Sequence, residues 1–308
     1  MQKVVIIGAD GFLGSQMALR LGKLGKDVLA LIFEGTKCKT LMGKQNILVQ
    51  EFSFENIFDI HIEGYDTIFH MAWAGVSSTY KNDAQTQAKN ILYGLKVLEW
   101  AKQNEIKKII VPGSASEVSC GQGVITGNEM PAPSDMYSAC KVATRYVCQT
   151  YARQHNLELV WTLITSIYGP GRYDNNLITY SIQTLLKGEK PSFTGLEQQW
   201  DYLYIKDLIE ALIALGEKGK AGKIYPIGSG KHQQISRYVY LLRDKIDPSL
   251  PLGIGDYPYK NPNKIDNQVL DISSIKEDTG FEPQYDFETG IEETIRYYKQ
   301  ATKVERST

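Results

Sequence analysis

Short apolar runs alternate with longer amphipathic segments along the first half of the chain. Five of these runs lack regular polar alternation: VVIIG, DVLALIF, DTIFHMAWAG, IKKIIVPGS and LELVWTLITS. Amphipathic segments of helical length separate them, as in residues 87–104. Strands without polar alternation that are separated by helices are typical of a parallel sheet covered on both faces. The pattern therefore predicts an α/β fold with a doubly wound parallel sheet in residues 1–168.

The pattern becomes irregular in the second half of the chain. A helix-like segment covers residues 176–189, a mixed run covers 199–219, and a short strand-like run lies at 223–231. Ligands of open α/β sheets bind beyond the carboxyl ends of the strands. We therefore expect residues 169–308 to form a smaller C-terminal α/β lobe that closes over that edge and binds the substrate.

Three glycines follow the first apolar run at intervals of three residues, in the segment GADGFLG. Glycine permits a tight turn, and the N–H groups at the start of the following helix can bind a pyrophosphate. A glycine motif alone is weak evidence, but this one lies between a predicted strand and a predicted helix. The sequence predicts a Rossmann-type NAD(P)-binding domain with cofactor contacts from Gly8, Gly11, Phe12, Leu13 and Gly14.

The end of the second apolar run bears on which dinucleotide binds. NAD-binding domains usually have an acidic residue there that bonds to the adenosine ribose. Ile32 occupies that position, and the nearest carboxylate belongs to Glu34. Lys37 and Lys39 follow and could attract the 2′-phosphate of NADP, although two lysines in a solvated loop are the simpler interpretation. The sequence favours NADP over NAD, with Glu34 and Lys37 as candidate cofactor contacts.

The overall composition narrows the class of protein. The chain has 308 residues, 22% of them charged, and a net charge of -1, which gives no electrostatic reason to expect nucleic acid or a membrane as partner. Its four cysteines and four histidines show no metal-ligand spacing, so we expect reduced thiols and no metal. With neither a signal-peptide pattern nor an apolar run of bilayer length, a soluble cytoplasmic protein is expected.

The segment SDMYSACKVATRY places Tyr137 four residues before Lys141. A helix would bring both side chains onto one face, where a phenol can exchange a proton and an ammonium can favour the phenolate. Tyr202 and Lys206 have the same spacing. The spacing alone therefore leaves the choice between the two pairs open.

Together these motifs resemble the extended short-chain dehydrogenase/reductase family, in particular its NAD(P)-dependent epimerase/dehydratase enzymes acting on nucleotide sugars. The resemblance covers nearly the whole chain and includes GADGFLG, FHMAWAG, YSACK, IYGPG, WDYLYIKDLIEAL and YPIGSG. It implies that residues 200–227 return to the dinucleotide-binding domain, which makes Tyr202 and Lys206 structural. The resemblance thus implies that Tyr137 and Lys141 are the catalytic pair.

The same resemblance assigns further residues around the cofactor. It implies that Ala72 and Asn90 contact the dinucleotide and that His70 is a buried strand-end residue near it without a catalytic role. It also implies a homodimer formed through two long helices, at residues 87–104 and 137–155.

Members of this family place a Ser or Thr beside the catalytic Tyr, and VPGSASEVSCG offers Ser114, Ser116 and Ser119. Comparison with a Gly-Ser-x-x-Glu-Tyr-Gly version of the motif selects Ser114. The dehydratase pattern Thr-Asp-Glu-Val-Tyr-Gly, aligned without a gap, would instead put Ala115 at the hydroxyl position and Ser116 where the acid belongs. We take Ser114 as the catalytic hydroxyl, with Ser116 as the alternative.

Departures from the family pattern make the substrate harder to predict. Many relatives have arginines that bind a pyrophosphate where this chain has Leu163 and Trp200. Arg172, Lys187 and Arg237 are possible substitutes. The candidate substrate contacts are Ser116, Glu117, Trp73, Arg172 and Trp200.

The resemblance also implies a mechanism, in which Tyr137 exchanges a proton with a sugar oxygen while hydride moves between the sugar and the nicotinamide. Lys141 would lower the Tyr137 pKa, and Ser114 would hold the reacting oxygen. The leading hypothesis is NADPH-dependent reduction of an NDP-4-keto-6-deoxyhexose. A UDP-glucose-type 4-epimerase with tightly bound NAD is the alternative. A 4,6-dehydratase or a non-catalytic NAD(P)-binding protein is less favoured.

Overall fold

A seven-stranded parallel sheet forms the centre of the computed structural model, which describes residues 1–77, 79–118, 123–259 and 267–305. The strand order is β11-β7-β5-β4-β1-β2-β3, and every neighbouring pair is parallel. This arrangement confirms the predicted doubly wound α/β fold. The strands are β1 (Lys3–Ile7), β2 (Asp27–Phe33), β3 (Ile47–Phe52), β4 (Thr67–His70), β5 (Lys108–Ser114), β7 (Glu158–Ile164) and β11 (Ile224–Ile227).

Both faces of this sheet are buried, which explains the continuous apolar runs in the sequence. On β1, Val4 and Ile6 join one hydrophobic core and Val5 and Ile7 join the other, because successive side chains of a strand point to opposite faces. One core is completed by α1 (Phe12–Lys23) and α5 (Ile205–Lys218), and the other by α2 (Ala84–Gln103) and α3 (Met136–His155).

The edge strand β3 is an element that the apolar runs do not reveal. Its sequence, ILVQEF, has a single fully buried side chain, Phe52, and its other positions are at least partly exposed. An edge strand pairs on one side only, so its sequence needs less apolar character than a central strand. Its existence is fixed by pairing with β2, from Val28 opposite Ile47 to Phe33 opposite Phe52.

Parts of the second half return to the sheet. Strand β11 pairs with β7, and α5 packs against α1 and β5. Helix α7 (Ser273–Thr279) also packs against α5 and β11, although the sequence division placed it in the substrate lobe. The sheet domain therefore recruits a third segment from the C-terminal half.

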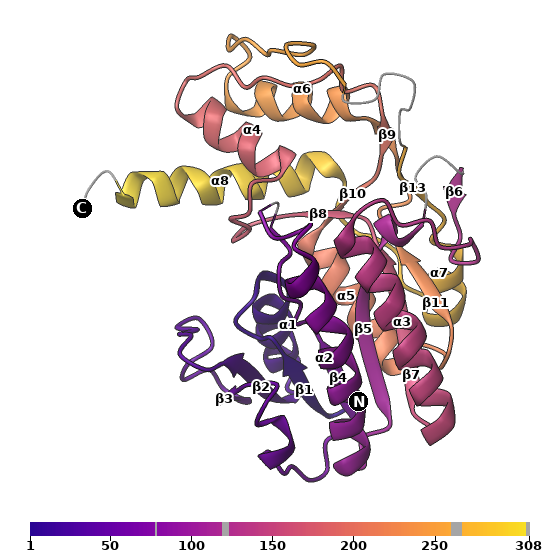
Figure 1. Ribbon diagram of the computed structural model, residues 1–308. Coiled ribbons are helices and arrows are strands. Elements are labelled where there is room, and N and C mark those ends of the chain that lie inside the picture. Colours follow the sequence, from indigo (N-terminus) through magenta and orange to yellow (C-terminus); the bar gives the residue numbers. More distant parts are fainter. Residues whose placement is uncertain (78, 119–122, 260–266, 306–308) are drawn as a thin grey trace.

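Helices α4, α6 and α8 are the main elements of a smaller lobe beyond the carboxyl ends of the strands, at the end of the sheet opposite the N-terminus (Figure 1). These helices group together, and the strands outside the main sheet form short two-stranded pairs. A small core of Phe193, Leu196, Ile235 and Val239 lies within it. The elements not yet introduced are η1 (Ile57–Asp59), η2 (Ala115–Glu117), β6 (Val124–Ile125), β8 (Ser166–Tyr168), α4 (Leu177–Leu186), β9 (Gln199–Trp200), β10 (Tyr202–Tyr204), β12 (Gln233–Gln234), α6 (Ile235–Ile246), β13 (Val269–Leu270) and α8 (Phe287–Glu305).

Candidate active site

The glycine loop between β1 and α1 requires glycine at two of its three positions. Gly8 has a φ of +81°, and a Cβ there would lie 2.8 Å from the backbone of Ala72. A Cβ on Gly14 would lie 2.1 Å from the Gly8 carbonyl oxygen. Gly11 is less restricted, since its Cβ would lie 3.4 Å from that oxygen. The loop therefore brings bare backbone against the end of β4, beside Ala72.

The start of α1 has the features that a pyrophosphate site needs. Gly11 is the N-cap residue, and no side chain caps the helix. The first N–H groups of a helix lack partners within it and attract anions. Phe12 and Leu13 occupy this first turn, half-buried. Asp10 has a buried carboxylate oxygen without a hydrogen-bond partner, which a ligand hydroxyl could satisfy. These residues fit a bound dinucleotide, and Asp10 was not among the sequence predictions.

The end of β2 offers no carboxylate inside the fold. Ile32 is buried at 4% exposure. Glu34 is exposed just beyond the strand, where its carboxylate accepts a hydrogen bond from the side-chain amide of Asn56. Lys37 and Lys39 are exposed. The two groups that sequence analysis weighed for the cofactor, Glu34 and Lys37, therefore both lie on the surface of this loop.

Asn90 holds the loop after β4 in place. Its side chain is buried and makes two hydrogen bonds to the backbone of Ala74, accepting from the N–H at 2.8 Å and donating to the carbonyl at 3.0 Å. Gln87, one turn earlier on α2, donates to the Gly75 carbonyl at 2.7 Å. Asn90 was predicted to contact the cofactor; its amide hydrogen-bonds to this loop, and the cofactor contact stays a prediction. Gln87 was missed because nothing in its sequence context marks a buried amide.

Tyr137 lies in the first turn of α3, whose start is held from two sides. Asp135 caps the helix by accepting from the Ser138 N–H at 2.8 Å. Lys81 forms an ion pair with Asp135 at 2.6 Å, and its carbonyl accepts from the Tyr137 N–H at 3.1 Å. The position of Tyr137 thus depends on the loop before α2 as well as on its own helix.

Lys141 lies one turn after Tyr137 on the same face of α3 and is buried at 5% exposure. Its Nζ donates to the Pro112 carbonyl at 2.7 Å, near the end of β5. The same nitrogen lies 3.7 Å from the ring centroid of Trp73 and 5.9 Å from that of Tyr137. The Trp73 and Tyr137 rings meet edge to face at 5.9 Å. The structure thus brings three of the predicted site residues together.

Burial dominates the titration of this pair. It raises the pKa of Tyr137 to about 12, against the opposing effect of a hydrogen bond with Ser114. It lowers the pKa of Lys141 to about 7, against the attraction of the Glu117 carboxylate. Lys141 was expected to lower the Tyr137 pKa. That expectation is not met by the protein groups alone, because removing the phenol from water disfavours its anion more than its neighbours stabilise it.

Ser114 ends β5 and reaches the Tyr137 phenol. Its Oγ lies 2.8 Å from that of Ser116 and caps η2. Ala115, the alternative position in the dehydratase register, is fully buried in the sheet core. The geometry therefore favours Ser114, with Ser116 as its hydrogen-bond neighbour. The third candidate, Ser119, lies outside the described residues.

Glu117 is fully buried. One carboxylate oxygen accepts from the Ser114 N–H at 2.9 Å and from the Trp161 indole at 3.0 Å. The other lies 3.1 Å from Nε of Arg145. Glu117 was expected to contact the substrate, and its burial behind Ser114 argues against that placement. Trp161 and Arg145 were missed because their partners are far away in the sequence.

Arg172 and Trp200 lie where the smaller lobe meets the sheet domain. Arg172 forms a two-pronged ion pair with Asp174, with one distance of 2.8 Å, and also donates to the Ile167 carbonyl. Its positive charge acts on Tyr137. The Trp200 indole donates to Ser166 Oγ at 2.9 Å. Both side chains are half-buried, and Arg172 already has Asp174 as an ion-pair partner.

The two members of the second Tyr-Lys pair, Tyr202 and Lys206, contact different partners. Tyr202 is buried against the ring of Tyr238 at 4.9 Å. Lys206 is bonded to Glu293 of α8 at 2.7 Å. These packing contacts agree with the structural role that the resemblance implied for the pair.

His70 closes β4 behind the site. It is buried, and its pKa falls to about 3 because of burial and the nearby Lys141 charge. Such a side chain stays neutral in the physiological range and is a poor base. Among the described residues, no group of three or more His, Cys, Asp or Glu side chains could hold a metal ion.

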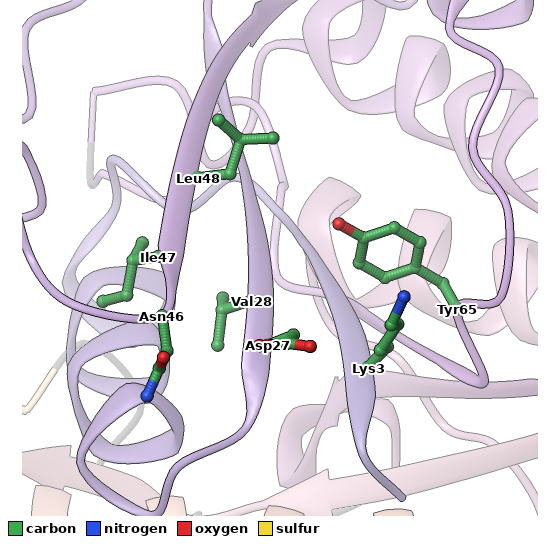
Figure 2. A pocket seen from close by; sticks show the side chains of 7 residues that line it. All are labelled: Lys3, Asp27, Val28, Asn46, Ile47, Leu48 and Tyr65. Carbon is green, nitrogen blue, oxygen red and sulfur yellow. The ribbon is translucent and has the colours of Figure 1, made fainter.

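A separate surface hollow lies at the amino ends of the strands (Figure 2). Lys3 and Asp27 begin β1 and β2, and Tyr65 precedes β4. The hollow and Tyr137 thus lie at opposite ends of the strands. It is lined by Lys3, Asp27, Val28, Asn46, Ile47, Leu48 and Tyr65.

Fold and site together define a class of protein. It is a Rossmann-type α/β protein with a glycine loop before a helix that no side chain caps, and with a Tyr-Lys pair near the carboxyl ends of its strands. The model of the NAD dependent epimerase/dehydratase family matches residues 4–228. The chain belongs to that family. Within the part of the chain that the structure describes, none of the helices has both the length and the apolar character needed to cross a membrane.

Two 4,6-dehydratases are similar to the chain in sequence. A dTDP-D-glucose 4,6-dehydratase of Dictyostelium discoideum is 28% identical over 255 residues, which cover 74% of this chain and 58% of that protein. A dTDP-glucose 4,6-dehydratase of Escherichia coli is 25% identical over 333 residues, covering 96% and 92%. The match therefore spans little more than half of the Dictyostelium protein but most of the Escherichia coli protein.

Solved structures show the same fold at low identity. The UDP-glucose 4-epimerase of Thermotoga maritima, with UDP-glucose, has a TM-score of 0.82 at 23% identity, covering 98% of this chain and 100% of that chain. The dTDP-glucose 4,6-dehydratase of Bacillus anthracis, in complex with NAD, has a TM-score of 0.84 at 18% identity, covering 98% of both chains. Epimerases and dehydratases thus share this fold, so the reaction has to be inferred from the site.

Proposed function

We propose that the chain is an NAD(P)-dependent oxidoreductase of nucleotide sugars, and that it reduces an NDP-4-keto-6-deoxyhexose with NADPH. The observation that carries the proposal is the grouping of Tyr137, Ser114 and Lys141, while the carboxylate of Glu117 is buried behind them. Membership of the family and the nucleotide-sugar names of its relatives support the substrate class.

The residues of the glycine loop would hold the dinucleotide. The bare backbone at Gly8 and Gly14 allows close approach, and the first turn of α1 at Phe12 and Leu13 offers N–H groups to the pyrophosphate. Asp10 would accept a hydrogen bond from a cofactor hydroxyl. When bound, the nicotinamide supplies the hydride. The lack of a carboxylate at Ile32 supports NADPH over NADH.

Tyr137 would donate a proton to the C4 oxygen of the substrate. A phenol with a raised pKa holds its proton until that oxygen gains negative charge, so Tyr137 acts as a general acid. Ser114 would donate a second hydrogen bond to the same oxygen and orient it. Lys141, when protonated, would favour the tyrosinate left after transfer.

The position of Glu117 supports reduction over dehydration. Eliminating water from a sugar needs an acid and a base at the reacting carbons in addition to the hydride step. Glu117 is the carboxylate next to Ser114 in sequence, and its two oxygens are engaged by Ser114, Trp161 and Arg145. It would have to leave this buried pair to reach a substrate.

A homodimer is part of the proposal. Helices α2 and α3 pack side by side and expose Leu92 at 62% and Tyr146 at 52%. Large apolar side chains on one surface of two long helices suit a helix-to-helix contact with a second copy. Light scattering of the wild type and of a Leu92→Glu variant would test it, since the variant should dissociate.

Mass spectrometry and fluorescence of the purified protein, followed by titration with NADH and NADPH, would test the cofactor assignment. Preferential NADPH binding to a site that purifies without nicotinamide is expected for the reductase. Tightly retained NAD would instead favour a 4-epimerase, which reoxidises its cofactor within one turnover. NADPH oxidation with 4-keto sugar nucleotides is the activity assay.

A matched pair of variants tests the role of Tyr137. Tyr137→Phe should lower kcat about 10²- to 10⁴-fold, the usual loss when a general acid is removed. Tyr202→Phe removes the hydroxyl of the other Tyr-Lys pair and should leave kcat within a few-fold. Equal activity of Tyr137→Phe and wild type would reject the mechanism.

A further inference from the structure

A buried ion pair lies directly behind Ser114. Glu117 has no exposed surface and Arg145 is 4% exposed, and their charged groups approach to 3.1 Å. Burying two charges is expensive unless geometry and hydrogen bonds compensate. Here compensation is partial, because Arg145 Nε and one further guanidinium nitrogen have no hydrogen-bond partner, nor does the Glu117 oxygen that faces them.

The pair is aligned with the proposed catalytic face of α3. Tyr137, Lys141 and Arg145 follow one another at intervals of four residues, so their side chains lie on one side of the helix. Glu117 faces this side from η2 and bonds the backbone N–H of Ser114 at 2.9 Å. The ion pair therefore connects the strand end that carries Ser114 to the helix that carries Lys141.

The charges around Lys141 leave Glu117 as the anion that acts on it. Burial lowers the pKa of Lys141, and the Glu117 carboxylate opposes that shift. His70 on β4 stays neutral because its pKa is about 3, and Tyr137 stays neutral because its pKa is about 12. Burial raises the pKa of Glu117 itself, and bonding to the Ser114 backbone and attraction by Arg145 oppose this.

We propose that Glu117 and Arg145 are positioning residues of the site: Arg145 stabilises the Glu117 carboxylate, and Glu117 fixes Ser114 and stabilises the Lys141 ammonium. The catalytic meaning of this arrangement rests on the proposed function, but the charge coupling does not. Glu117 thereby serves the site from behind and makes no contact with the substrate.

Lysine side-chain NMR on ¹³C-lysine-labelled protein tests the coupling without any turnover. The Lys141 signal is assigned as the one that Lys141→Met removes, and its titration is followed in wild type and in Glu117→Gln. Removing a nearby opposite charge should lower the titration midpoint by about one pH unit or more. Asp207→Asn is the matched control, since Asp207 is a carboxylate of 1% exposure held by the backbone of residues 284 and 285. An unchanged midpoint in Glu117→Gln overturns the proposal.

A double variant covers the case in which Glu117→Gln does not fold. Glu117→Gln with Arg145→Met removes both charges, and replacing a buried ion pair by neutral groups is often neutral for stability. The Lys141 midpoint should fall in the double variant as well, because the carboxylate that supports its charge is gone. A wild-type midpoint in a folded double variant would overturn the inference.

Kinetics separate this inference from the proposed function. In either variant kcat should fall at least about tenfold with KM nearly unchanged, and the alkaline limb of the pH-rate profile should move to lower pH, following Lys141. A folded variant with wild-type kcat and pH profile would overturn the positioning role. If wild type reduces no 4-keto sugar nucleotide while the NMR midpoint still moves, the proposed function fails and the charge coupling stands.

Discussion

Replacing Lys141 with methionine should change how stability depends on pH. Burial lowers the pKa of Lys141 from its ordinary value of 10.5 to about 7. Between these values the unfolded chain binds a proton that the folded chain does not, so the free energy of unfolding rises with pH. Below pH 7 both states carry the proton and the full cost of burying the ammonium is present. One pH unit corresponds to about 1.4 kcal/mol, so the gain from pH 7 to pH 9 is about 2 kcal/mol once half-titration at pH 7 is included.

Urea unfolding of wild type and Lys141→Met at pH 7, 8 and 9 measures this gain. The stability advantage of the methionine variant should shrink by about 2 kcal/mol over the range, because only the wild type has the titrating amine. Groups that do not interact with Lys141 contribute equally to both proteins, including Cys148, whose thiol pKa burial raises to about 12. A constant difference from pH 7 to pH 9 would refute the reasoning, since a lysine with an ordinary pKa stays charged in both states throughout.

Three further substitutions test the supports of the site. Gly14→Ala should destabilise the fold by about 1 to 3 kcal/mol, because its Cβ would lie 2.1 Å from the Gly8 carbonyl oxygen; Gly11→Ala, at 3.4 Å, should keep a melting temperature near that of wild type. Asn90→Ala leaves buried backbone groups of the β4 to α2 loop unpaired and should lower the free energy of unfolding by about 2 kcal/mol or more, and unchanged urea unfolding would mean that the loop does not need this amide. Asp135→Ala removes the cap of α3 and should cost about 1 kcal/mol in the same assay, whereas Asp135→Asn, which can still cap, should recover most of it.

The central strands of the sheet could be predicted because their burial is visible in short, continuous stretches of sequence. A central parallel strand is buried on both faces, so β1, β2, β5 and β7 appear in the sequence as continuous apolar runs. Strand β3 escaped because an edge strand tolerates polar residues such as Gln50 and Glu51. The packing of α7 against β11 was also not predicted, since no local sequence pattern indicates which of two lobes a short helix joins.

In the candidate site, too, the contacts between residues close in sequence could be predicted and the contacts between distant residues could not. Tyr137 and Lys141 are four residues apart, so helix geometry alone puts them on one face. The contacts of Glu117 with Arg145 and Trp161 join residues 28 and 44 positions apart, and no local pattern encodes them. The direction of the Tyr137 pKa shift was wrong for a related reason. Charge partners can be read from a motif, whereas the depth of burial that outweighs them depends on the whole fold.

The position of the Glu117 carboxylate bears on whether reduction or dehydration takes place on this fold. A glutamate that touches the substrate can exchange protons at a second carbon, which an elimination requires and a reduction does not. In this chain the glutamate bonds the strand end at Ser114 and faces Arg145, so its charge acts on Lys141 from within the core. That arrangement leaves Tyr137 as the proton donor of the proposed reaction. We infer that the choice between reduction and dehydration depends on whether Arg145 holds Glu117 inside the protein, and a single Arg145→Met variant that keeps Glu117, assayed for both reactions, tests this.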